Sequence, residues 1–199
     1  MNLCDQLGRH LRQRERTILG MRGAISCAVL IPLLPTTAQA DYDVVYTLRS
    51  EHLPNHKGQV AFPGGKRSGH EELVETALRE SHEEIGLIPS DVTILGCLDD
   101  VTTMAGQYVI TPWVGLLPGE YAFQANPNEV ADIFSVRLSE LRDPRHHGQT
   151  RKSWGGNHYD LPVITAGRHE IWGATLQITG NFLEILDQLE RGGASKSPR

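Results

Sequence analysis

The framework of this chain is set by Gly64-Gly65-Lys66-Arg67-Ser68-Gly69-His70-Glu71, followed after seven residues by Arg79-Glu80-Ser81-His82-Glu83-Glu84-Ile85-Gly86-Leu87. The first part holds three glycines, which allow positive φ angles and close approach of the backbone to another group. From Glu71 to Ile85 there is neither Gly nor Pro, and apolar residues recur at helical spacing. We therefore predict a loop that leads into a helix, with Gly86 as its C-cap.

Three acidic residues of this predicted helix, Glu80, Glu83 and Glu84, fall within one narrow sector of its surface. Like charges at this spacing destabilise an isolated helix by about 0.2–0.5 kcal/mol per pair. Taken alone, three glutamates most often form a solvated helix face. Hard divalent cations such as Mg²⁺ take oxygen ligands, however, and keep water and substrate phosphates in their shell. The surrounding pattern favours this second interpretation, a metal site for phosphate chemistry.

That pattern, G-x5-E-x7-R-E-U-x-E-E-x-G-U with U a bulky aliphatic residue, resembles the Nudix box of the Nudix hydrolases. The matching positions are Gly65, Glu71, Arg79, Glu80, Glu83, Glu84, Gly86 and Leu87, and only Ser81 departs from the pattern. The resemblance implies an α/β Nudix fold, with a mixed β-sheet sandwiched between helices. It also implies Mg²⁺ or Mn²⁺ bound by Glu80 and Glu84 with Glu83 nearby, and an ion pair between Glu71 and Arg79 that pins the loop to the helix.

The segment before the box, from Thr47-Leu48-Arg49-Ser50 to Gly58-Gln59-Val60-Ala61-Phe62-Pro63-Gly64-Gly65, resembles the coenzyme A pyrophosphatase branch of this family. The resemblance implies hydrolysis of coenzyme A to 3′,5′-ADP and 4′-phosphopantetheine. Pro54 stands where the branch has an Arg, so another cation would have to replace it. The candidate substrate-binding residues are Arg49, His56, Lys57, Gly64 and Gly65.

Other interpretations stay open. Because of Pro54, the alternative of a Nudix pyrophosphatase for ADP-ribose, a dinucleotide polyphosphate or a nucleoside triphosphate stays open. A ligand-sensing Nudix module without catalysis is less favoured, because binding alone does not require three clustered acids. For the general base that takes the proton of the attacking water, the candidates are Glu83 and Glu129, with Asp99, Asp100 and Glu120 competing for the role of a later acid.

Composition sets the remaining bounds. The 199 residues suit a single domain, with residues 1–20 as a helical extension and residues 191–199 as a flexible tail. A net charge of −5 argues against binding to nucleic acid or an anionic membrane, and the family resemblance implies a small-molecule substrate as the partner. The oligomeric state stays open, including a homodimer. Three cysteines without C-x-x-C spacing fit a reducing cytoplasm.

An apolar run after Met21, ending near Ala38-Gln39-Ala40, resembles a signal peptide, but its position and length favour a buried strand. We predict the strands 24–34, 42–48, 59–62, 92–98 and 108–117, with Pro112 marking an edge or a bulge. Residues 128–134 fit a helix or a strand. A long polar loop over 143–157, a hairpin of 158–164 with 170–172 and a helix over 173–189 complete the prediction.

Overall fold

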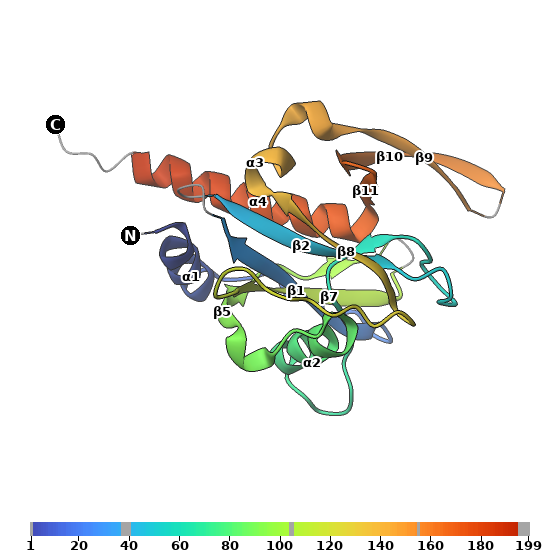
Figure 1. The fold of residues 1–199 in the computed structure, drawn as a ribbon, viewed down its shortest axis with the longest axis horizontal. Helices are drawn as coiled ribbons and strands as arrows, with labels where there is room; N and C mark the ends of the chain where they lie inside the picture. Colours follow the sequence, from blue (N-terminus) through green and yellow to red (C-terminus); the bar gives the residue numbers. More distant parts are fainter. Residues whose placement is uncertain (1, 37–40, 104–105, 155, 195–199) are drawn as a thin grey trace.

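A mixed eight-stranded sheet forms the centre of the molecule in the computed structural model, which describes residues 2–36, 41–103, 106–154 and 156–194 (Figure 1). Its strands are β1 (Ile25–Pro35), β2 (Tyr42–Arg49), β3 (Val60–Ala61), β4 (Gly64–Lys66), β5 (Thr93–Cys97), β6 (Val101–Thr102), β7 (Tyr108–Leu116) and β8 (Val130–Arg137). The main path runs β3-β2-β1-β7-β5, with β4 on β1, β6 on β7 and β8 on β2. Only β1 and β7 pair in parallel among these strands.

Four helices and a second, three-stranded sheet surround this centre. The helices are α1 (Leu3–Gln13), α2 (Leu73–Ile85), α3 (Leu138–Leu141) and α4 (Gly173–Ala194), and the second sheet joins β9 (His147–Trp154), β10 (Asn157–Ala166) and β11 (His169–Trp172). Helix α2 lies on one side of the large sheet and α4 on the other (Figure 1). This is the mixed sheet between helices that the sequence predicts. None of the helices in the described ranges is long and apolar enough to cross a bilayer.

Strand β1 shows why both faces of the sheet are covered. Ala28 and Leu30 face the cluster of α2, whereas Ile31 and Leu33 face the cluster that includes α1 and α4. A strand that is buried on both faces has a nearly continuous apolar sequence, as residues 27–34 do. The strand predicted over 24–34 is therefore confirmed, while the Ala38-Gln39-Ala40 motif lies outside the described residues.

Helix α2 begins and ends as its sequence indicates. Glu72 is the N-cap and forms a capping box with Glu75, so the helix starts at Leu73, inside the stretch 71–85 that lacks Gly and Pro. Gly86 closes it with a φ of 68°, a conformation that disfavours any residue with a side chain. Ser81, the one departure from the family pattern, is fully buried and donates its hydroxyl to the Ala77 carbonyl at 2.6 Å.

At both ends of the chain the helix boundaries differ from the prediction. The N-terminal helix stops at Gln13, because Arg14 and Arg16 pair with Asp99 and Asp100 and hold the next segment extended along β5 and β6. Helix α4 continues to Ala194, so residues 191–194 are helical and not part of a tail; residues 195–199 lie outside the described ranges.

The long loop predicted over 143–157 is wrong, because most of it is strand β9, which pairs with β10 along its whole length. Cross-strand contacts such as Arg151 with Asp160 at 2.7 Å stabilise this polar strand, which has no apolar alternation to reveal it. The hairpin of 158–164 with 170–172 is confirmed as β10 and β11, and residues 130–137 form a strand.

Pro112 does not mark an edge, since β7 lies between β1 and β5. The Pro112 carbonyl accepts from Leu98 N–H at 2.8 Å, at the interruption between β5 and β6. The proline nitrogen, which cannot donate, therefore falls where the neighbouring strand is broken.

Candidate functional site

The glycine loop lies against the backbone of β1 because two of its residues have no side chain. Strand β4 pairs with β1 through Gly64↔Val29 and Gly65↔Ala28. Gly64 has a φ of 150°, and a Cβ there would lie 2.3 Å from the Ala28 carbonyl oxygen and 2.5 Å from the Val29 Cα. No other residue fits this position without moving the central strand.

The same loop brings its backbone against two carboxylates of α2. A Cβ on Gly65 would lie 2.3 Å from Oε2 of Glu80, so this carboxylate occupies the space that a side chain would need. One turn further along, Oε2 of Glu84 accepts the Gly64 N–H at 3.1 Å. The glycine pair thus fixes the position of Glu80 and Glu84 beside one stretch of backbone.

Burial disfavours the charged form of both carboxylates. Glu84 is only 4% exposed, and its burial raises its pKa to about 8, against the Gly64 N–H and Arg49, which lower it. Glu129 and Glu80 raise the pKa of Glu84 further. Burial also raises the pKa of Glu80, against the hydrogen bond from Arg79. Such a group of desolvated acids favours a bound proton or a bound cation.

Arg79 ties the loop to the helix. Its guanidinium donates to both carboxylate oxygens of Glu71 at 2.9 and 3.1 Å, and to the Lys66 carbonyl at 3.2 Å. The Arg79 hydrogen bond, with help from the Ser68 N–H, lowers the pKa of Glu71 to about 2. The pair therefore has the loop-pinning geometry that the family resemblance implies.

The remaining N–H groups of Arg79 hold two of the three clustered glutamates. Nη1 donates to Glu80 at 2.9 Å and to Glu83 at 3.3 Å. The Glu83 side chain is 49% exposed, whereas those of Glu80 and Glu84 are 17% and 5% exposed. Glu83 is thus oriented by Arg79 at the edge of the site, outside the buried pair.

Arg49 reaches the same place from the end of β2. Its Nη1 lies 3.9 Å from Oε1 of Glu84, and its buried Nε has no hydrogen-bond partner among the described residues. A buried N–H without a partner costs roughly 1–3 kcal/mol, and an anion from the substrate would satisfy it. His56 and Lys57 lie in the exposed loop after β2, and no contact within the described ranges joins either to the carboxylates.

Of the later acids, the fold brings Glu129 to the site. Glu129 acts electrostatically on both Glu80 and Glu84. Asp99 and Asp100 are engaged by Arg14 and Arg16 on the N-terminal segment, and Glu120 is exposed in the turn after β7.

Sequence reasoning missed Asn126, which holds Glu129 in place. The backbone N–H of Asn126 donates to the Glu84 carbonyl at 2.9 Å, and its carbonyl accepts from Glu129 and Val130. Its side-chain amide donates to Oε1 of Glu129 at 3.2 Å, while its side-chain oxygen accepts from Asn128 N–H. The sequence Asn126-Pro127-Asn128, with residues typical of turns, is the signal that could have pointed to it.

Replacing Asn126 by Ala should lower kcat by about tenfold and leave KM within about twofold, because the Glu129 carboxylate loses the donor that orients it. Steady-state kinetics with the pH profile of kcat measure this effect. Asn128→Ala is the matched control, since Asn128 contributes only its backbone N–H to the turn. An unchanged kcat and pH profile in Asn126→Ala would remove Asn126 from the site.

The donor set fits a hard divalent cation. Glu80 and Glu84 offer carboxylate oxygens, and Glu129 adds negative charge. Across the described part of the chain, no three acidic, His or Cys side chains are already gathered closely enough to enclose an ion. Mg²⁺ typically binds one or two carboxylates and completes its shell with water and substrate phosphates, which matches this open arrangement.

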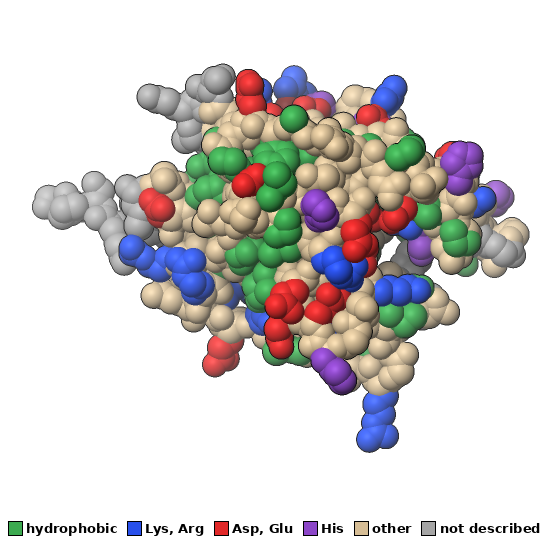
Figure 2. All heavy atoms as spheres, turned by 60° about the horizontal axis from the view of Figure 1, so that its bottom comes forward, with side chains coloured by type: hydrophobic (Ala, Val, Ile, Leu, Met, Phe, Trp, Pro, Cys, Tyr) green, Lys and Arg blue, Asp and Glu red, His purple; other side chains and the backbone are tan. Residues whose placement is uncertain are grey.

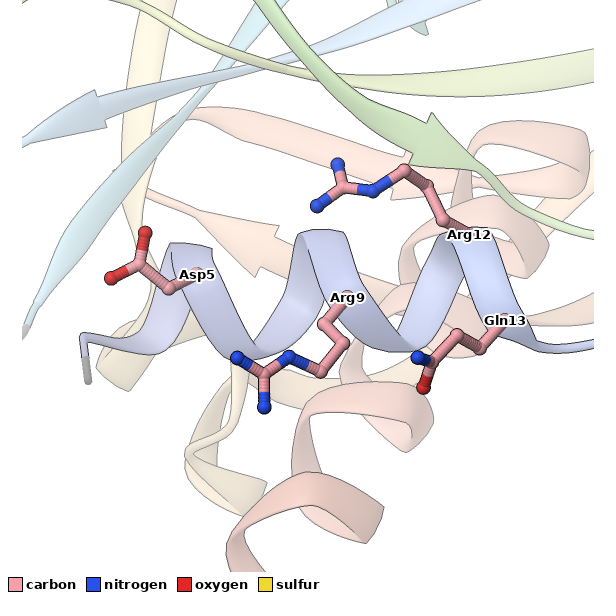
Figure 3. A pocket seen from close by; sticks show the side chains of 4 residues that line it. All are labelled: Asp5, Arg9, Arg12 and Gln13. Atoms are coloured by element: carbon pink, nitrogen blue, oxygen red, sulfur yellow. The ribbon is translucent and has the colours of Figure 1, made fainter.

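Charged side chains of both signs gather on the face that carries α2 (Figure 2). A separate hollow of about 430 Å³ lies along α1, lined by Asp5, Arg9, Arg12 and Gln13 (Figure 3). These four side chains come from a single helix, and Arg12 turns toward β5, where it donates to the Leu95 carbonyl at 3.3 Å. None of the candidate site residues described above lines this hollow.

Comparison with known proteins agrees with this geometry. Residues 27–153 match the NUDIX domain family. The human mitochondrial coenzyme A diphosphatase NUDT8 is 36% identical over 165 residues, which cover 81% of this chain and 69% of that protein. The Nudix hydrolase NudL of Enterobacter sp. (strain 638) is 38% identical over 178 residues, which cover 84% of this chain and 91% of the relative.

Solved structures show the same fold. A MutT/nudix family protein from Enterococcus faecalis superimposes with a TM-score of 0.56 at 16% identity, covering 94% of this chain and 70% of the other. A binary complex of the Ap4A hydrolase of C. elegans gives a TM-score of 0.52 at 14% identity, covering 85% of this chain and 98% of that protein. At such low identity the likeness concerns the fold alone, and it confirms the architecture that the sequence predicts.

Proposed function

Because the chain belongs to the Nudix hydrolase family, we propose that it hydrolyses the diphosphate bond of coenzyme A, with a divalent cation held by Glu80 and Glu84. The observation that supports this most directly is the buried Glu84 beside Arg49. The Arg49 Nε has no partner in the described part of the chain, so a carboxylate for a cation lies next to a donor for a phosphate. The likeness to a coenzyme A diphosphatase over 81% of the chain supports this choice of substrate.

A bound Mg²⁺ or Mn²⁺ would offset the negative charge of the diphosphate. Groups of the protein itself contact the substrate and accept the proton. Arg49 donates to a phosphate oxygen next to Glu84, and Gly64 and Gly65 leave room for the phosphates to approach the backbone. Glu129, oriented by Asn126, accepts the proton of the attacking water. Glu83, the other candidate base, is held at the rim by Arg79.

In the reaction, the water oxygen bonds to one phosphorus and the bridging oxygen leaves with the other phosphate. The products from coenzyme A are 3′,5′-ADP and 4′-phosphopantetheine. Arg49 and a cation held by Glu80 and Glu84 would stabilise the negative charge that develops during this displacement.

Pro54 favours a second candidate, a pyrophosphatase for another nucleoside diphosphate-linked compound, because an Arg at that position would be a ready contact for the 3′-phosphate. ADP-ribose, a dinucleotide polyphosphate and a nucleoside triphosphate belong to this class. A module that binds such a ligand without cleaving it is less consistent with the crowded acids of α2.

Product identification by mass spectrometry separates these candidates. Incubation of the protein with coenzyme A and Mg²⁺ or Mn²⁺ should release 3′,5′-ADP and 4′-phosphopantetheine, faster than the other three compounds are cleaved, and not at all with a chelator. Faster cleavage of ADP-ribose or a polyphosphate would favour the second candidate. Binding of coenzyme A without any product would favour the sensing module.

A further inference from the structure

A second pocket is lined by residues of β2, of β3 and the loop between them, and of the three-stranded sheet, at the end of β2 that carries Arg49. Its volume is about 280 Å³, near the lower end of small-molecule pockets at roughly 300 Å³. Leu48 and Val60 form one wall, while Lys152, Arg168 and Trp172 form part of the other. The two walls come from distant segments of the chain, and Thr175, near the start of α4, donates its hydroxyl to the Val60 carbonyl at 2.9 Å.

The pocket and the candidate metal centre both involve the end of β2. Leu48 precedes Arg49, whose guanidinium lies 3.9 Å from Glu84. The backbone of Arg49 pairs with Gly58 and Gln59, and Gly58 also lines the pocket. Because successive side chains alternate across a strand, Leu48 and Arg49 point to opposite faces of β2, so a ligand with its diphosphate at Arg49 would reach the pocket around the strand end, past Gly58.

The polar lining consists of two cations that are held in place but retain donors. Lys152 Nζ donates to Glu170 at 2.7 Å and lies 5.2 Å from the centroid of the Trp172 ring. Arg168 donates from Nη2 to Asp132 at 2.7 Å, yet its side chain is 78% exposed. An ammonium has three N–H donors and a guanidinium has five, so both can also bind an anion.

Contacts of His169 fix the backbone next to Arg168. His169, only 9% exposed, stacks on Phe134 with ring centroids 3.9 Å apart, and its Nε2 lies 3.4 Å from Asp132. His169 itself lines the pocket together with its neighbours Arg168 and Glu170, so its stacking on Phe134 fixes the backbone that carries Arg168. The pocket thus combines an apolar wall with two positioned cations, an arrangement suited to a flat purine that bears a phosphate.

From this geometry we infer that the pocket binds the 3′-phosphoadenosine end of coenzyme A, an inference that rests on the proposed function. Lys152 and Arg168 contact the 3′-phosphate, and Trp172 with Leu48 and Val60 contacts the purine. The assignment also answers the question raised by Pro54. Arg49 is committed to the diphosphate beside Glu84, so the cations for the 3′-phosphate come from β9 and from the turn before β11.

The test compares coenzyme A with dephospho-coenzyme A, which lacks only the 3′-phosphate. Arg168→Ala and Lys152→Ala should each raise KM for coenzyme A by about tenfold and change KM for dephospho-coenzyme A by less than about twofold. Arg151→Ala is the matched control: it removes a cation from the same strand, on its opposite face, where Arg151 pairs with Asp160. That variant should behave as wild type, and Arg49→Ala should raise KM for both substrates.

The outcomes separate this inference from the proposed function. If the wild-type protein cleaves coenzyme A but Arg168→Ala and Lys152→Ala affect both substrates equally, or neither, the pocket assignment is wrong and the proposed function stands. If the wild-type protein leaves coenzyme A intact, the proposed function is wrong and the assignment falls with it. A direct measurement supports the same distinction: 3′,5′-ADP should compete more strongly than 5′-AMP in wild type, and equally in Arg168→Ala.

Discussion

Replacing Glu84 by Gln should lower kcat by about a thousandfold or more and leave the fold intact. Gln has nearly the same shape as Glu, and its carbonyl can still accept the Gly64 N–H, so the buried side chain keeps its packing. What it loses is the negative charge that would hold a cation beside Glu80. Without that cation, the charge of the diphosphate stays uncompensated.

Steady-state kinetics at saturating Mg²⁺ measure the effect on kcat, and circular dichroism checks the fold. Thermal unfolding gives a second, independent reading: Mn²⁺ should raise the Tm of the wild-type protein and have little effect on Glu84→Gln. Glu184→Gln, an exposed position on α4, is the matched control for loss of one carboxylate. Near wild-type turnover in Glu84→Gln, with a full Mn²⁺ shift in Tm, would show that the metal is not bound here.

Replacing Gly64 by Ala should destabilise the protein by about 3 kcal/mol or more. The added Cβ would lie 2.3 Å from the Ala28 carbonyl and 2.5 Å from the Val29 Cα, and both belong to the backbone of the central strand β1. The φ of 150° adds strain for any residue with a side chain. For a chain of this size, such a loss lowers Tm by about 6–12 °C.

Gly65→Ala is the informative comparison, because its Cβ would meet only the Glu80 carboxylate. That flexible group can move, so Gly65→Ala should keep most of the stability and lose most of the activity. Chemical denaturation together with kinetics distinguishes the two variants. Equal losses of stability in both variants would contradict the interpretation that Gly64 is required for packing against β1 and Gly65 for the position of the Glu80 carboxylate.

The helix and the acids of the site were predictable because their signals are local. The absence of Gly and Pro from residue 71 to residue 85, the cap at Gly86 and the spacing of Glu80, Glu83 and Glu84 are all properties of one short stretch. The strand over 25–35 was predictable for the same reason, since burial on both faces requires a continuous apolar run.

Strand β9 was not predictable in this way. Its sequence His-Gly-Gln-Thr-Arg-Lys-Ser-Trp has one large apolar residue, the terminal Trp, and its partners Asp160 and Glu170 come from later strands. Cross-strand pairs form only after the hairpin closes, so no local pattern distinguishes such a strand from a loop. The pocket of Lys152, Arg168 and Trp172 was missed for the same reason.

By itself, the sequence determined the loop, the helix that follows it and the identity of the acids on that helix, because backbone freedom, capping and helical periodicity act over a few residues. Only the tertiary structure decided that Glu84 is buried beside Arg49. It also decided that the more exposed Glu83 pairs with Arg79, and that Asn126 holds Glu129 near the other acids. Those arrangements depend on which surfaces lose water when distant segments meet, and that desolvation raises the pKa of Glu80 and Glu84, the two acids proposed to hold a cation.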